Sequence, residues 1–311
     1  MSLALIALNQ ILIMFLIMVL GFFCYKIKII NQETNKKLSD FLLLIVNPLL
    51  IFNSYQRDFN KELLNGLAIS FALAIISHIV AIGGAWLLVR GKSKQDIPLE
   101  RFSCIYSNCG FMGIPLVNSL YGSEGVFYLT AYMTVFNLLV WTHGVILMTG
   151  HKNLKALVKT LISPTFIASI AGLIFFLLTI RTPGILFHSM DYVASMNTPL
   201  AMIIAGVTLA QSEIKKIFRK RRIYLIIFIK QFAIPLVLLL MYFRLPFDHK
   251  VITTAVLASG CPVAATGTLF ALRYNKNHLY ASELYSVSTL AAIVTIPIIM
   301  LIAGYLLSLK F

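Results

Sequence analysis

Ten apolar segments of about twenty residues or more recur along this chain, and they restrict its fold more than any other feature. A helix needs about 20 residues to cross the ~30 Å hydrocarbon core of a bilayer, so each segment is long enough to span a membrane. Mean hydropathy is +0.88 and only 12% of the residues are charged, which excludes an ordinary globular protein. We therefore predict an all-α integral membrane protein with ten transmembrane helices, at residues 3–25, 38–55, 64–89, 102–121, 126–149, 157–180, 192–209, 223–243, 251–274 and 281–309.

The basic residues predict how these helices are oriented. Of the 26 Lys and Arg residues, 19 lie in the loops after odd-numbered segments and five in the loops after even-numbered segments. Cytoplasmic loops are the ones enriched in Lys and Arg, so both termini are expected outside the cytoplasm of a multi-pass cell-membrane protein. The net charge of +15 is assigned to this orientation rather than to nucleic-acid binding, which needs a basic face on a soluble module.

The positions of motifs that contain Pro and Gly predict that the second half of the chain repeats the first. Asn47-Pro-Leu matches Thr198-Pro-Leu at an offset of 151 residues, and the same offset places Asn108-Cys-Gly on Ser259-Gly-Cys. Five helices per half is an odd number, so the second half is inverted relative to the first. The alternative is that Gly and Pro are simply frequent in membrane helices.

The predicted architecture is accordingly a single membrane domain built from two inverted five-helix repeats. Residues 1–150 form the first repeat and residues 151–311 the second. The fourth and ninth helices are expected to be broken and to cross one another.

The fourth segment carries the passage that is least compatible with a continuous helix. Gly110 and Gly113 relax the backbone, and Pro115 removes an N–H and clashes with the preceding turn. The ninth segment repeats this pattern around Pro262. Opened backbone groups cost several kcal/mol each in hydrocarbon, so such breaks persist only where protein, water or a ligand pairs with them. Two breaks indicate a transporter with its substrate near the membrane midplane.

The candidate substrate-binding residues lie at these breaks and in the second, seventh and eighth segments. Small residues at the breaks have an alternative role in close helix packing, and buried amides have an alternative role in tying helices together. The candidates are Asn47, Asn108, Gly110, Gly113, Pro115, Asn197, Thr198, Lys230, Ser259, Gly260, Cys261, Pro262 and Thr266.

Few ionisable residues lie near the middle of the predicted membrane segments. Lys230 either extends to the cytoplasmic interface or pairs with an anionic substrate. His78 is interpreted as a structural histidine, with titration as the alternative. The sequence shows no nucleophile arranged with a base and no clustered metal ligands, so we predict neither an enzyme nor a metal site. Four cysteines in apolar segments indicate no disulfide framework.

The residues around these motifs resemble the auxin efflux carrier family, which includes bacterial malate and malonate carriers and plant auxin carriers. The most specific stretches are Asn47-Pro-Leu-Leu-Ile-Phe, Asn108-Cys-Gly-Phe-Met-Gly-Ile-Pro115, Thr198-Pro-Leu-Ala-Met-Ile-Ile-Ala-Gly206 and Ser288-Thr-Leu-Ala-Ala-Ile-Val-Thr-Ile-Pro297. The resemblance implies ten helices in two inverted halves, crossing helices unwound near Pro115 and Pro262, and movement of organic anions.

These observations together predict a secondary transporter of small organic anions, dicarboxylates or auxin-like carboxylates, that works by alternating access. Energy is expected from the anion gradient, the membrane potential or a coupled Na⁺ or H⁺, because no ATP-binding motif is present and no cofactor is indicated. A membrane sensor for such anions is the alternative, with an intramembrane enzyme behind it. The oligomeric state is left open, with a homodimer as one arrangement.

Overall fold

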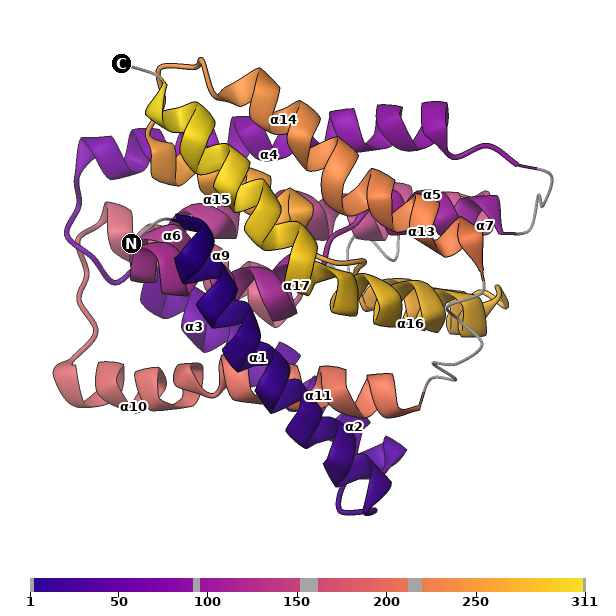
Figure 1. The fold of residues 1–311 in the computed structure, drawn as a ribbon. Coiled ribbons are helices and arrows are strands. Elements are labelled where there is room, and N and C mark those ends of the chain that lie inside the picture. The colour runs from indigo at the N-terminus through magenta and orange to yellow at the C-terminus, as the bar shows by residue number, and fades with distance from the viewer. Residues whose placement is uncertain (1–2, 92–95, 152–161, 212–219, 310–311) are drawn as a thin grey trace.

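The computed structural model describes residues 3–91, 96–151, 162–211 and 220–309. The regular elements in these ranges are helices, four of which are single π-helical turns (η1–η4) inserted into longer helices (Figure 1). The elements are α1 (Leu3–Lys26), α2 (Gln32–Phe41), η1 (Leu42–Val46), α3 (Asn47–Ser54), α4 (Lys61–Leu88), α5 (Ile97–Ile105), η2 (Cys109–Gly113), α6 (Ile114–Leu139), η3 (Val140–Gly144), α7 (Val145–Thr149), α9 (Pro164–Leu177), α10 (Gly184–Ser195), α11 (Asn197–Ala210), α13 (Arg221–Phe228), η4 (Ile229–Ala233), α14 (Ile234–Tyr242), α15 (His249–Gly260), α16 (Thr266–Arg273) and α17 (His278–Ser308).

Seven helical stretches in the described part of the chain are long and apolar enough to cross a membrane. They are Leu3–Lys26, Gln32–Ser54, Lys61–Leu88, Cys109–Thr149, Gly184–Ala210, Arg221–Tyr242 and His278–Ser308, and the shorter Pro164–Leu177 is also apolar. The prediction of an all-helical membrane protein is therefore confirmed.

The difference between seven stretches and ten predicted spans has three local causes. The ninth span is divided into α15 and α16, neither of which is long enough alone. The fourth span loses α5 to a break, and its remaining part is joined to the fifth span across a kink at Gly122, whose φ of 60° and ψ of −153° are not helical. Part of the sixth span, residues 157–161, lies outside the described residues.

Side chains before several helices fix where those helices begin. Asn31 accepts a hydrogen bond from the Thr34 N–H, and Asn60 accepts one from the Glu62 N–H. Asp248 caps α15 in the same way through the Lys250 N–H. Each bond satisfies one of the N–H groups that a first helical turn leaves without a partner.

The helices pack into two groups. The first group contains α1, α2, α3, α9, α10 and α11, and the second group contains α4 to α7 and α13 to α17. In Figure 1, α10 and α11 lie along one side of the molecule and α4 and α14 along the opposite side. Within the first group α1 packs most extensively against α11, and it also contacts α17 and α6 of the second group.

The contact between α1 and α11 depends on two glycines. A Cβ atom at Gly206 would lie 1.9 Å from the Met18 carbonyl oxygen, and one at Gly21 would lie 2.4 Å from the Ile203 carbonyl oxygen. No real Cβ atom occupies such positions, so the two backbones touch directly. Small residues that let helix backbones approach are typical of helix pairs in membranes.

Candidate functional site

The two helix breaks predicted from the sequence lie against one another. The Asn108 N–H donates to the Pro262 carbonyl over 2.7 Å, and the Ala264 N–H donates to the Tyr106 carbonyl over 3.0 Å. Between these bonds, Ser107 and Val263 form an isolated antiparallel bridge. Each break thus supplies partners for backbone groups that the other has opened, which is what a break in a membrane segment requires. We call residues 106–108 and 261–265 the crossing.

The first break lies upstream of the predicted position. Gly110 and Gly113 belong to the π-helical turn η2, and Pro115 lies in the first turn of α6, inside a continuous helical stretch. The interpretation of Pro115 as a helix breaker is therefore wrong. In η2 the Gly113 N–H bonds to the Asn108 carbonyl five residues back, and this wider turn leads into the proline without a break.

The second break lies where the sequence placed it. The last residue of α15 is Gly260, Cys261 has non-helical backbone angles, and Pro262 stands in the non-helical stretch before α16. Ser259 and Gly260 therefore end one half-helix, and Thr266 begins the other. A Cβ atom at Gly113 would lie 3.5 Å from Cys261 Sγ, so these two candidates meet across the crossing.

Lys230 is completely buried and contacts the end of α15. Its Nζ donates to the Ser259 carbonyl over 2.9 Å, and its relative exposure is 0%. The interpretation that Lys230 extends to the cytoplasmic interface is therefore wrong. The next residue, Gln231, donates to the Ser288 carbonyl, and the Ser288 hydroxyl accepts the Val263 N–H of the crossing.

Two polar side chains at the crossing have unused hydrogen-bonding capacity. The Asn108 amide nitrogen and the Thr266 hydroxyl are both buried, and neither has a hydrogen-bond partner among the described residues. Asn108 immediately precedes η2 and Thr266 is the first residue of α16, so each stands at the N-terminal end of a half-helix. These ends carry partial positive charge and free N–H groups.

The candidates in the second and seventh segments lie in the first helix group. The Asn197 side-chain nitrogen Nδ2 donates to the Asn47 side-chain oxygen Oδ1 over 2.5 Å, and both side chains are buried. This bond joins α3 to the start of α11, which also carries Thr198. Since η2 packs against α11, the crossing lies at the boundary between the two groups.

His78 is hydrogen-bonded through only one of its two ring nitrogens among the described residues. Its Nδ1 hydrogen-bonds to the Ala74 carbonyl over 2.8 Å, and its ring lies 4.8 Å from the Tyr132 ring. Its Nε2 is buried without a hydrogen-bond partner in the described ranges.

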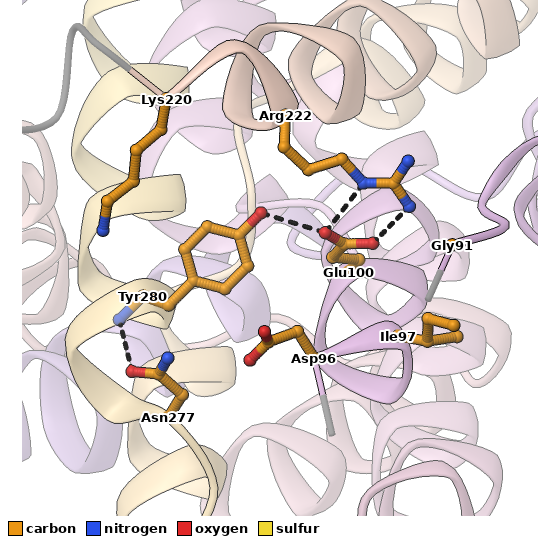
Figure 2. A pocket seen from close by; sticks show the side chains of 8 residues that line it. All are labelled: Gly91, Asp96, Ile97, Glu100, Lys220, Arg222, Asn277 and Tyr280. Carbon is orange, nitrogen blue, oxygen red and sulfur yellow. Dashed lines mark hydrogen bonds and ion pairs between the residues drawn. The ribbon is translucent and has the colours of Figure 1, made fainter. Parts of the chain in front are cut away.

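A second polar cluster, missed by the sequence analysis, lies in a cavity of about 470 Å³ at one end of α5 (Figure 2). Glu100 is buried there and receives two bonds from Arg222, of 2.9 and 2.6 Å, and one of 3.0 Å from the Tyr280 hydroxyl. The cluster ties the half-helix before the first break to α13 and α17. Glu100 lies two residues before the predicted fourth membrane segment, which begins at residue 102, so no pattern in the sequence marked it as buried.

Comparison with known proteins identifies the family. The family model described as Membrane transport protein matches residues 6–156 and 151–300, which is nearly the whole chain. This chain belongs to that family. The resemblance to auxin efflux carriers is thereby confirmed, and the membership makes the protein a membrane transporter.

Transporters of several microorganisms are similar to this chain over most of their length. "Uncharacterized transporter YfdV" of Escherichia coli K12 is 24% identical over 298 residues, covering 91% of this chain and 93% of that protein. An "Uncharacterized transporter" of Methanothermobacter thermautotrophicus is 23% identical over 290 residues, with the same coverage. The "Putative malonate transporter" of Rhizobium meliloti is 25% identical over 276 residues, covering 83% of this chain and 84% of that protein.

Proposed function

We propose that this protein is a secondary transporter of small organic anions, dicarboxylates or auxin-like carboxylates, and that it works by alternating access. The observation that carries the proposal is the pairing of two helix breaks through Asn108 with Pro262 and Ala264 with Tyr106. Discontinuous helices that meet in this way form the substrate site of many secondary transporters.

The crossing has the electrostatics to bind an anion. The half-helices that start at Cys109 and Thr266 direct their positive ends to it, and Lys230 adds a full positive charge nearby. The unpaired Asn108 amide and Thr266 hydroxyl are able to donate hydrogen bonds to carboxylate oxygens. The name of the Rhizobium meliloti relative supports a dicarboxylate as the first substrate to test.

The two helix groups suggest how access alternates. The first group would act as a scaffold, because α1 and α11 are locked backbone to backbone. The second group, which holds both breaks, would rock against it and carry the substrate across. In this proposal the chain crosses the cell membrane ten times, residues 1–150 and 151–311 are inverted repeats, and both termini lie outside.

Counterflow tests the proposal directly. Purified protein in liposomes loaded with unlabelled malonate is expected to accumulate labelled malonate transiently, and malate and indole acids are tested in the same way. A sensor would bind these anions and raise the melting temperature without moving them, since binding to the native state stabilises by mass action. Binding without counterflow for any of the anions would refute transport and favour the sensor.

A double variant tests whether the substrate binds at the crossing. Asn108→Ala together with Thr266→Ala removes the two unpaired donors and is expected to weaken anion binding by about 100-fold or more, since each of the two hydrogen bonds to a charged group contributes roughly 1.5–3 kcal/mol. Wild-type affinity in this double variant would place the substrate elsewhere.

A further inference from the structure

The last carbonyl groups of α15 lack the backbone N–H donors that a continuous helix would provide. In a continuous helix the carbonyls of Ala258, Ser259 and Gly260 would accept from the N–H groups four residues later. Pro262 has no N–H, the Val263 N–H donates to Ser288 Oγ, and the Ala264 N–H donates to the Tyr106 carbonyl. The turn thus presents carbonyl oxygens and the negative end of a helix dipole inside a membrane segment.

The Lys230 ammonium lies at this turn. Its Nζ is 2.9 Å from the Ser259 carbonyl oxygen, and no part of the side chain is exposed. Within the part of the chain that the structure describes, no ion pair includes Lys230. Among the described residues, the partner of this ammonium is therefore a backbone carbonyl, that of Ser259, and not a carboxylate.

Carbonyls at the C-terminal end of a broken helix are what coordinate the coupling cation in ion-driven transporters. We infer that the second break of this protein is a monovalent-cation site that the tethered ammonium of Lys230 fills permanently. An ammonium has three N–H donors and one positive charge, so it can pair with carbonyls at the end of a helix without a metal ion.

The π-helical turn η4 explains how one helix reaches this site with two successive side chains. Lys230 and Gln231 both lie in η4 and are both fully buried. Lys230 bonds to Ser259 before the break, and Gln231 bonds to Ser288, which holds Val263 within the break. Single π-helical turns are frequent at functional sites because they redirect side chains in this way.

One consequence rests on the proposed transport function: transport needs no Na⁺. The position at which a Na⁺ ion would enter is already occupied by an ammonium group that is covalently attached to the protein. Wild-type counterflow is expected to be equal in Na⁺, K⁺ and N-methylglucamine buffers. A several-fold dependence on Na⁺ would overturn this consequence.

Chemical rescue tests the cation site itself, independently of transport. Lys230→Ala removes three methylene groups and the ammonium, which is the size of n-propylammonium. The variant is expected to melt about 5 °C or more below wild type in detergent. Propylammonium at tens of millimolar should restore part of this loss, while propanol, which has the same length and no charge, should not.

Two control variants separate the effect of the Lys230 charge from the effects of side-chain volume and of a lysine at an exposed helix end. Lys230→Met fills the same volume without charge, so it should be destabilised and should not respond to propylammonium. Lys26 also donates from Nζ to the last carbonyl of a helix, that of Ala210 over 3.2 Å, but it is exposed, so Lys26→Ala should change the melting temperature little. A Lys230→Met protein as stable as wild type, or a Lys230→Ala protein that propylammonium does not stabilise more than propanol does, would overturn the inference. Because melting is measured without substrate, these results stand even if the protein moves no organic anion.

Discussion

Gly206 of α11 lies directly on the backbone of α1, where a Cβ atom would stand 1.9 Å from the Met18 carbonyl oxygen. The contact fixes the distance between two helices of the first group and leaves no room for any side chain at that position.

Gly206→Ala is therefore expected to destabilise the protein by more than about 3 kcal/mol, because a rigid backbone atom has to move. The melting temperature in detergent measures the effect. Gly83 is the matched control: it lies inside α4 with no atom within 4 Å of its Cβ position. Gly83→Ala should be neutral or stabilising by up to about 1 kcal/mol, since Ala favours a helix. Equal melting of the two variants would show that α1 and α11 do not touch as described.

The two prolines near the crossing are expected to differ in importance. Pro262→Ala restores an N–H that can bond to the Ala258 carbonyl, so α15 gains a turn at the expense of the crossing. Transport should fall by about tenfold or more while expression changes little, as measured by counterflow and by yield. Pro115→Ala changes a first-turn position and should leave counterflow within about twofold of wild type. The opposite ranking would contradict the placement of the first break at residues 106–108.

The Glu100–Arg222 pair is expected to stabilise the half-helix α5. Glu100 is 5% exposed in its side chain and Arg222 is 34% exposed, so removing one charge leaves the other partly buried and unpaired. Arg222→Met should cost about 1–3 kcal/mol. The ion pair of Arg181 with Asp58 is the control, because Asp58 is fully exposed and surface pairs contribute about 0–1 kcal/mol. Thermal melting of both variants in the same detergent provides the comparison, and a larger loss for Arg181→Met would refute the assignment.

The Asn47–Asn197 bond is expected to contribute to folding. Asn47→Ala leaves the Asn197 amide buried without its partner, so the protein should lose about 1–3 kcal/mol of stability. The double variant Asn47→Ala with Asn197→Ala should be less destabilised than the sum of the single variants, because the two residues act as one unit. Malonate affinity, measured by titration, separates the two roles of these amides: a loss of affinity in excess of about tenfold with unchanged melting would assign them to the substrate site.

The orientation of the helices in the membrane is predicted from the distribution of Lys and Arg in the loops alone. Lys92 and Arg219 lie outside the described residues, in loops that the excess of basic residues assigns to the cytoplasm. In a variant with Cys24 replaced by Ser, a membrane-impermeant thiol reagent added to intact cells should miss a cysteine at either position and label one at Arg57 or Lys250. Labelling in the reverse pattern would invert the proposed orientation.

Local features of the sequence were sufficient for the class of protein and for one half of the crossing. Long apolar segments predict membrane helices because each segment must satisfy its own backbone in lipid. Pro262 marks the second break because the missing N–H is a property of that residue alone. The family motifs were equally local, and the family match confirms them.

Only the tertiary structure decided where the first break lies and what Lys230 contacts. Tyr106, Ser107 and Asn108 include no proline or glycine, and their helix opens because the Pro262 carbonyl and the Ala264 N–H offer partners from a distant part of the chain. The burial of Lys230 depends on the Ser259 carbonyl at the end of α15, and that of Glu100 depends on Arg222 and Tyr280. The position of the break and these contacts depend on which segments of the chain meet in space. Neither the hydropathy of a segment nor its residue types show which other segment it will contact.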